Sequence, residues 1–208
     1  MPWSPKKKVV QISESHCGPA VLEMLLSNIG VEVEQEEIVT AAGASETLAV
    51  HGLRIDQMAV VTTKVAPQSQ FWYKYHSSIE DIIYILKKGY GVGVEWQGLF
   101  YQNEKEERKA IRRGHELADD LGHYSIISHI DEDKQMLIII DPYMDFAGQD
   151  RIFPVASFLP RWWDTNEIFD SVQGKMTIVE DERLLFFITP SEEEMLEKMN
   201  FQKFASVE

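Results

Sequence analysis

The most reactive side chain in this sequence is its single cysteine, Cys17. It stands directly before Gly18 and Pro19, and apolar residues follow at helical spacing as far as Ile29, with Gly30 as a stop. Pro19 suits the first turn of a helix, where its missing N–H costs nothing. The free N–H groups and the dipole of a helix N-terminus stabilise a thiolate, the nucleophilic form of cysteine. The pattern predicts a helix from about Gly18 to Ile29 that begins at a nucleophile.

A thiol nucleophile needs a base, and the base needs an acceptor that orients it. His123 opens an apolar run that reaches Ile130, and Asp141 closes a second run that begins at Met136. The two runs predict a β-hairpin that turns at 131–134, with His123 and Asp141 at its open end.

The register of this hairpin decides whether the pair can meet. Side chains alternate between the two faces of a strand, so a four-residue loop at 131–134 would place Asp141 on the opposite face from His123. A five-residue loop, or a bulge in the hairpin, would place both on one face. The hypothesis therefore requires an odd-length loop or a bulge between Tyr124 and Ile140.

Gln11 lies six positions before Cys17, and its side-chain amide could donate to a developing oxyanion. Taken singly, each of these residues has a plainer role. The cysteine could be a small buried residue, the histidine a strand residue, the aspartate part of a turn before Pro142, and the glutamine a surface amide. The ordered set of Gln11, Cys17, His123 and Asp141 favours catalysis, because it supplies every role that a cysteine nucleophile requires.

The same residues resemble the bacteriocin-processing, double-glycine cysteine peptidase family of the papain-like superfamily. The resemblance rests on Gln11, on Cys17-Gly18-Pro19-Ala20 before a helix, on Gly122-His123-Tyr124 and on Ile140-Asp141-Pro142-Tyr143, and it spans roughly residues 9–165. It implies that Cys17 is the nucleophile, His123 the base, Asp141 the orienting residue and Gln11 the oxyanion donor. His16 departs from the family, which commonly has a small or acidic residue there. No transporter segments follow, so the resemblance implies a stand-alone member whose substrate is open.

The remaining elements indicate an α+β protein, with an N-terminal helical part packed on an antiparallel sheet. We expect helices at 34–42, 53–61 and 191–200, a helix up to Lys87 capped by Ser77 or Ser78, and strands at 90–96 and 184–188. The charged stretch 103–121 is expected to be an exposed helical insertion in a single domain of residues 1–208.

The composition of the chain limits the classes of partner and the compartment that we expect. The chain has 208 residues and a formal net charge of -14, which disfavours binding to nucleic acid. It has no apolar run of the length of a membrane span, and its basic N-terminus lacks the apolar stretch of a secretory signal. With one cysteine it can form no internal disulfide, which suits a reducing compartment. We expect a cytoplasmic protein that needs no membrane and no cofactor.

A metal site is the main competing chemistry. His115-Glu116-x-x-Asp119 places His115 and Asp119 on one face of a helix, and His123 and His129 lie beyond it. The zincin motif has a second histidine where this sequence has Asp119. The surrounding charges are typical of a solvated helix, so no metal site is expected.

The sequence thus predicts a cysteine peptidase that hydrolyses a peptide or amide bond through a Cys17 thioester, with a peptide or protein as substrate. A thioester-forming acyltransferase or transglutaminase-like enzyme would use the same residues. A non-catalytic peptide-binding protein on the same fold, and a metal hydrolase, are the other classes. The oligomeric state is open.

Overall fold

The fold of this chain comes from a computed structural model, which describes residues 3–98, 122–170, 174–191 and 193–204. The helices are α1 (Cys17–Asn28), α2 (Gln35–Ala42), α3 (Leu48–His51), α4 (Ile55–Val65), α5 (Ile79–Lys87), α7 (Val155–Phe158), the 3₁₀ turn η1 (Leu159–Arg161) and α8 (Glu194–Glu197). The expected helical insertion at 103–121, with His115 and Asp119, lies outside the described residues. The expectation of a single domain over residues 1–208 therefore stays a prediction.

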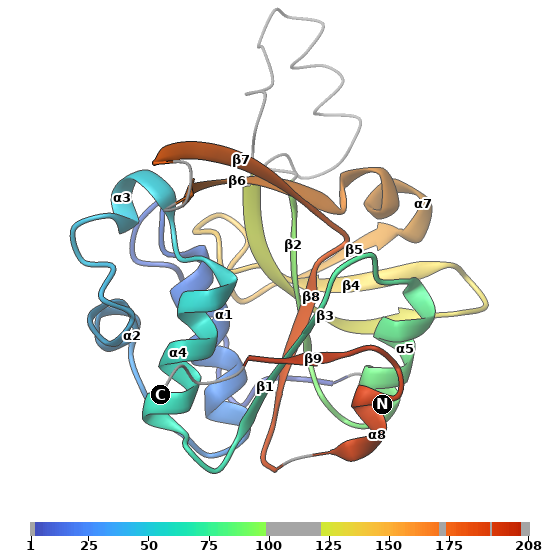
Figure 1. Cartoon of the computed structure of the whole chain (residues 1–208). Coiled ribbons are helices and arrows are strands. Elements are labelled where there is room, and N and C mark those ends of the chain that lie inside the picture. Colours follow the sequence, from blue (N-terminus) through green and yellow to red (C-terminus); the bar gives the residue numbers. More distant parts are fainter. Residues whose placement is uncertain (1–2, 99–121, 171–173, 192, 205–208) are drawn as a thin grey trace, which may run out of the picture.

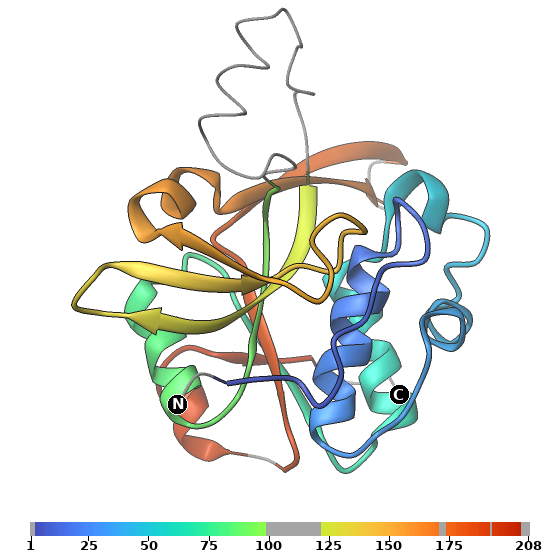
Figure 2. The ribbon, with the colours of Figure 1, turned by 180° about the vertical axis from the view of Figure 1, so that it is seen from behind.

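Antiparallel pairing organises the strands. Within the described residues, seven of them form one sheet in the order β5-β4-β3-β2-β8-β1-β9, and β6 and β7 form a separate hairpin. The strands are β1 (Gln70–Lys74), β2 (Val92–Gln97), β3 (Gly122–Asp131), β4 (Met136–Ile140), β5 (Asp150–Pro154), β6 (Trp163–Asp170), β7 (Lys175–Glu182), β8 (Leu185–Thr189) and β9 (Gln202–Lys203). Figures 1 and 2 show α1 to α4 gathered beside this sheet and the β6–β7 hairpin running across one end of the molecule.

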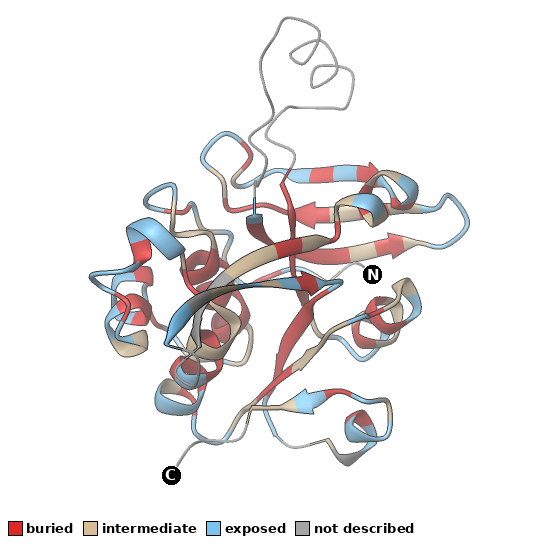
Figure 3. Cartoon of the chain, turned by 45° about the horizontal axis from the view of Figure 1, so that its top comes forward, coloured by how far each residue is buried: buried red, intermediate tan, exposed pale blue. Residues whose placement is uncertain are grey.

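The sheet separates two apolar cores, and β8 shows how. Its alternate residues Phe186 and Ile188 pack with α1, α2 and α4, whereas Leu185 and Phe187 pack with α5, α7 and α8. A strand buried on both faces reads as a continuous apolar run, as this one does. The central strands are accordingly buried along most of their length, while the outer turns of the helices are exposed (Figure 3). The expected α+β architecture, helices packed on an antiparallel sheet, is confirmed. None of the helices in the described part of the chain has the length and apolarity to cross a membrane.

Local signals explain where the predicted helices begin and end. Helix α1 begins at Cys17 and runs to Asn28, as expected. Of the two capping candidates before α5, Ser78 is the cap: its hydroxyl accepts from the Asp81 N–H, and the Asp81 carboxylate accepts from the Ser78 N–H. Gly43 ends α2 in a left-handed conformation, with φ of 68°, which glycine adopts without strain.

The β3–β4 hairpin contains the required bulge, although its register differs from both expected ones. Asp131 pairs with Met136, so the loop is the four residues 132–135, and the ladder shifts between Ile127 and His129. Beyond this bulge Ile126 pairs with Ile140. Continued from there, the alternation puts Asp141 opposite Ser125, on the face that His123 also uses. Without the extra residue, Asp141 would oppose Ile126 and point away from His123.

One expectation about the C-terminal part needs correction. The helix expected at 191–200 is only the single turn of α8, Glu194–Glu197. Leu196 alone of its described side chains is deeply buried, and one buried side chain gives a longer helix little to pack on. Among the N-terminal helices there is one strand, because β1 lies between α4 and α5 and pairs with β8.

Candidate active site

Cys17 occupies the first residue of α1, and His16 is the N-cap, whose carbonyl accepts from the Ala20 N–H at 3.0 Å. The rest of the helix is almost wholly buried, whereas Cys17 is half-buried and lines a pocket. Gly18 makes this placement possible. A Cβ on Gly18 would lie 3.1 Å from the Leu53 Cβ and 2.8 Å from the Met58 Cε, so a larger residue would push the helix start away from its neighbours.

His123 and Asp141 form a buried pair at the open end of the hairpin. Their exposed fractions are 3% and 1%, and the His123 Nε2 donates to Asp141 Oδ1 at 2.8 Å. This leaves Nδ1 of the ring to face Cys17, whose side chain interacts with His123. Burial lowers the pKa of His123, but Asp141 and Cys17 outweigh that effect and raise it to about 10. At neutral pH the ring therefore carries a proton beside the sulfur.

Asp141 is held by more than the histidine. Oδ1 also accepts the Tyr143 N–H at 3.0 Å, and Oδ2 binds the Arg151 guanidinium. Burial raises the pKa of Asp141, but His123, Arg151 and the Tyr143 N–H together lower it to about 2. Arg151 is fixed in turn, 3.6 Å above the ring of Phe146. The carboxylate is therefore ionised and fixed in orientation.

Gln11 is 2% exposed and belongs to an N-terminal strap, residues 3–11, that is tied to the sheet. The Trp3 N–H donates to the carbonyl of the bulged residue Ser128, and the Gln11 N–H donates to Pro142 O. The Gln11 Nε2 donates to Ser13 O at 2.8 Å and to Glu14 O at 3.2 Å. Its amide thus holds the loop before Cys17, and its Oε1 is buried without a partner among the described residues.

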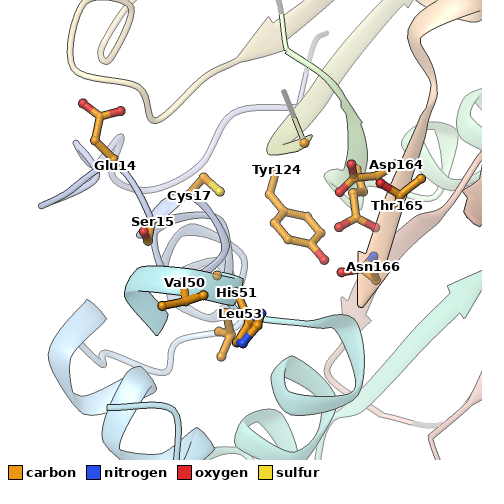
Figure 4. A pocket seen from close by; sticks show the side chains of 13 residues that line it. Glu14, Ser15, Cys17, Val50, His51, Leu53, Tyr124, Asp164, Thr165 and Asn166 are labelled. Carbon is orange, nitrogen blue, oxygen red and sulfur yellow. The ribbon is translucent and has the colours of Figure 1, made fainter. Parts of the chain in front are cut away.

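A pocket of about 350 Å³ opens beside the sulfur. Its walls come from the loop before α1, from α3 and the residues after it, from the ends of β2 and β3, and from β6. The lining residues are Glu14, Ser15, Cys17, Val50, His51, Gly52, Leu53, Glu95, Gly122, Tyr124, Asp164, Thr165 and Asn166. Figure 4 shows the Tyr124 ring lying between Cys17 on one side and Asp164 and Asn166 on the other. A substrate in this pocket would touch the thiol.

The model of the Peptidase_C39-like family matches residues 6–168 of this chain. The chain belongs to that family. The match covers most of the strap, α1, the hairpin and the first part of β6, and therefore all four residues singled out from the sequence.

Solved structures agree with this membership at the level of the fold. The peptidase domain of Streptococcus ComA, described as a bi-functional ABC transporter involved in a quorum sensing pathway, is 16% identical with a TM-score of 0.55, over 89% of this chain and 98% of that one. A putative C39-like peptidase from Bacillus anthracis is 15% identical with a TM-score of 0.58, over 92% and 100%. A double glycine motif protease from an AMS/PCAT transporter, solved with the leader peptide, is 13% identical with a TM-score of 0.52, over 92% and 99%. No curated protein matches this chain.

Three other features of this C39-like chain bear on the site. His16 is not among the residues that line the Cys17 pocket; its Nδ1 lies 2.6 Å from Ser13 Oγ, and burial lowers its pKa against the opposing effect of Glu36. Trp96 and Trp162 are buried core residues. Among the residues that the structure describes, no cluster of histidine, cysteine or acidic side chains has the makings of a metal site.

Sequence reasoning missed the residues that this C39-like chain gathers around the core of the site. Arg151 binds Asp141 only because β5 pairs with β4, and no motif marks that pairing. Glu95 alternates with the apolar residues Val94 and Trp96 along β2, and its face of the strand is covered rather than solvated. The Phe186 ring lies against Gly93, two residues earlier on that face. A carboxylate within the apolar run of β2 was the available signal.

Proposed function

We propose that this chain is a papain-like cysteine peptidase in which Cys17 is the nucleophile, His123 the proton carrier and Asp141 the residue that orients it. The observation that supports this is the continuous contact from the Cys17 side chain through the buried His123 ring to a clamped Asp141. Family membership points to the same chemistry, since the relatives are peptidases.

The proposed reaction follows from these positions. The Cys17 thiolate attacks the carbonyl carbon of the substrate, and protonated His123 gives its proton to the leaving amine as the C–N bond breaks. A water molecule then attacks the thioester, His123 takes a proton from it, and the acid leaves as Cys17 is restored. The backbone N–H groups at the start of α1 are the first candidates to stabilise the oxyanion. Gln11 assists only if substrate binding frees one of its two bonds to the loop.

The substrate class is proposed from the pocket and from one relative. That relative, the AMS/PCAT protease, was solved with a leader peptide. We propose a peptide or protein substrate whose scissile bond enters the pocket between the helical part and the sheet. A reducing compartment such as the cytoplasm would keep the Cys17 thiol free. No cofactor enters the proposed steps.

Peptide cleavage and thiol reactivity test the proposal together. A mixed fluorogenic peptide library should be cleaved by the wild type and not by Cys17→Ala or His123→Ala. His129→Ala, a change on the same strand but beyond the bulge, is the matched control and should retain activity. Gln11→Ala should lose on the order of a hundredfold in rate if it donates to the oxyanion.

Iodoacetamide labelling of the only thiol, followed by mass spectrometry, should be faster than for glutathione at neutral pH and slower in His123→Ala. Labelling as slow as glutathione, unchanged by His123→Ala and without cleavage, would overturn the proposal. A primary amine added as a competing acceptor separates hydrolysis from acyl transfer, because only acyl transfer gives an amide product of higher mass.

A further inference from the structure

The wall of the pocket that faces Cys17 is built from acidic and polar side chains. Glu95 on β2 lies directly opposite Tyr124 on β3, so the two side chains share one face of the sheet. Asp164 on β6 comes next to them: its carboxylate lies over Gly122 and accepts from the Gln97 Nε2 at 3.0 Å. Neither carboxylate is part of the proposed proton path.

Glu95 is the residue that demands an explanation. It is only 2% exposed, it lines the pocket, and its Oε2 has no hydrogen-bond partner among the residues that the structure describes. A buried carboxylate oxygen without a partner costs free energy, and such an atom calls for a functional role or for a partner from outside the chain. The missing partner is therefore expected to come from a ligand.

Charge indicates what kind of ligand this is. Burial raises the pKa of Glu95 to about 7, and the Asp181 carboxylate adds to the rise, against the opposing effects of Tyr124, Asp164 and Asn166. Burial also raises the pKa of Asp181, which interacts with Glu95 and Asn166. None of the described residues that line the pocket is a lysine or an arginine. Arg54 reaches the Asp181 side of this cluster, but it is bound to Asp56. The cluster thus has an excess of negative charge that an entering cation would relieve.

We propose that this pocket binds the lysine or arginine side chain of a substrate residue next to the scissile bond. The cationic group donates to Glu95 Oε2, and its aliphatic stem lies along Val50 and Leu53, which line the same pocket as Cys17. This inference rests on the proposed function, because it makes Cys17 the nucleophile that cuts beside the bound cation. It goes further in naming a basic residue as the specificity determinant.

Thiol reagents of different charge test the pocket without any turnover. Methanethiosulfonates that carry a primary ammonium, a methyl or a sulfonate group are reacted with Cys17, the only thiol, and each rate is divided by the rate of the same reagent with glutathione. We expect the primary ammonium reagent to exceed the methyl one by tenfold or more, the scale of one hydrogen-bonded charged group. In Glu95→Gln, which keeps the shape and removes the charge, this ratio should fall most of the way to one.

The effect of the acidic surface on the labelling rates must be distinguished from the effect of the pocket. Glu132→Gln removes one exposed charge at the β3–β4 turn, and it should leave the ratio unchanged. High salt should also leave most of the ratio in place, because a buried charge is screened far less than a surface charge. If the ratio collapses in salt, or if Glu95→Gln leaves it as high as in the wild type, the cation pocket is wrong.

Matched peptides then connect the pocket to cleavage. Peptides with lysine or arginine beside the scissile bond should have a kcat/KM at least tenfold above those with norleucine or citrulline, and Glu95→Gln should remove most of this preference. Free and acetylated amino termini should be cleaved alike, because the ligand is a side chain. Cleavage of neutral and basic peptides at equal rates overturns the cation pocket while the proposed function stands. Charge-selective labelling without cleavage of any peptide supports the pocket and overturns the proposed function.

Discussion

Asp141 makes more contacts to the candidate site than its sequence motif suggests. It accepts hydrogen bonds from His123, from the Tyr143 N–H and from Arg151, and it is only 1% exposed. A sequence motif can therefore identify Asp141 without identifying all of the groups that hold its carboxylate. The Asp141-Pro142 pair at the end of a strand is visible in the sequence, whereas the guanidinium that neutralises the carboxylate comes from the next strand.

Removing that guanidinium should be costly. In Arg151→Met the stem still packs on Phe146, but Asp141 Oδ2 loses its charged partner inside the protein. We expect the free energy of unfolding to fall by about 3–5 kcal/mol, the cost of breaking a buried pair from one side. Chemical denaturation measures it. Arg183→Met, which removes an exposed arginine 3.9 Å from Glu182, is the control and should change stability by less than about 0.5 kcal/mol. A similarly small loss in Arg151→Met would mean that Asp141 is held without Arg151.

The elements around the site were predictable to the extent that their signals are local. The start of α1, the arms of the hairpin and the apolar run of β8 all follow from residue spacing. The register of the hairpin could not be predicted from residue spacing. Gln135 takes a left-handed conformation, with φ of 52°, at a position where the sequence has no glycine to indicate a turn. The Asp131 Oδ1 also accepts the Lys134 N–H, which keeps Asp131 at the end of the ladder and out of the loop. Glu95 and Asp164 meet only through β2 and β6, elements far apart in sequence.

Helix α2 reaches the site through one side chain. The Gln35 Nε2 donates to Val10 O at 2.9 Å, and its Oε1 accepts from the Ile12 N–H at 3.1 Å. The amide therefore fixes the backbone on both sides of Gln11, as a neighbouring strand would.

Gln35→Leu should leave these two backbone groups without partners at a cost of about 1–3 kcal/mol. Because the loop before Cys17 loses its anchor, we expect kcat on the best library peptide to fall several-fold while KM changes little. Steady-state kinetics at saturating peptide checks this. Gln70→Leu is the matched control, since among the described residues the Gln70 amide donates only to the neighbouring Phe71 carbonyl. Equal kinetics in the two variants would show that α2 does not position the loop.

At the scale of the whole molecule, the His123–Asp141 pair makes stability depend on pH. The pKa of His123 rises from 6.5 to about 10 in the folded chain, so its stabilising effect is complete below about pH 6.5 and is lost as pH rises toward 10. The pKa of Asp141 falls from 3.8 to about 2, so its effect is present above about pH 4 and is lost as pH falls toward 2.

The difference in Tm between the wild type and Asp141→Asn should therefore be largest between about pH 4 and 6.5, and it should shrink on both sides. Thermal melts across this range measure it. Taking the difference removes the contribution of Glu95, whose raised pKa is common to both proteins. A difference that stays constant from pH 4 to pH 9 would mean that the pair is not ionised as described.

The sheet order has a consequence for when this molecule can begin to work. Strand β8 lies between β2 and β1, so in the described sheet the strands that carry Glu95 and His123 are joined to β1 through a strand that follows all of them in the sequence. A ribosome that has completed β7 has already produced Cys17, His123 and Asp141, yet the sheet that supports them still lacks the strand that joins β2 to β1. Such long-range pairing also forms slowly. A nascent chain should therefore lack a complete site until β8 has been made, so the proposed activity would begin only after that point.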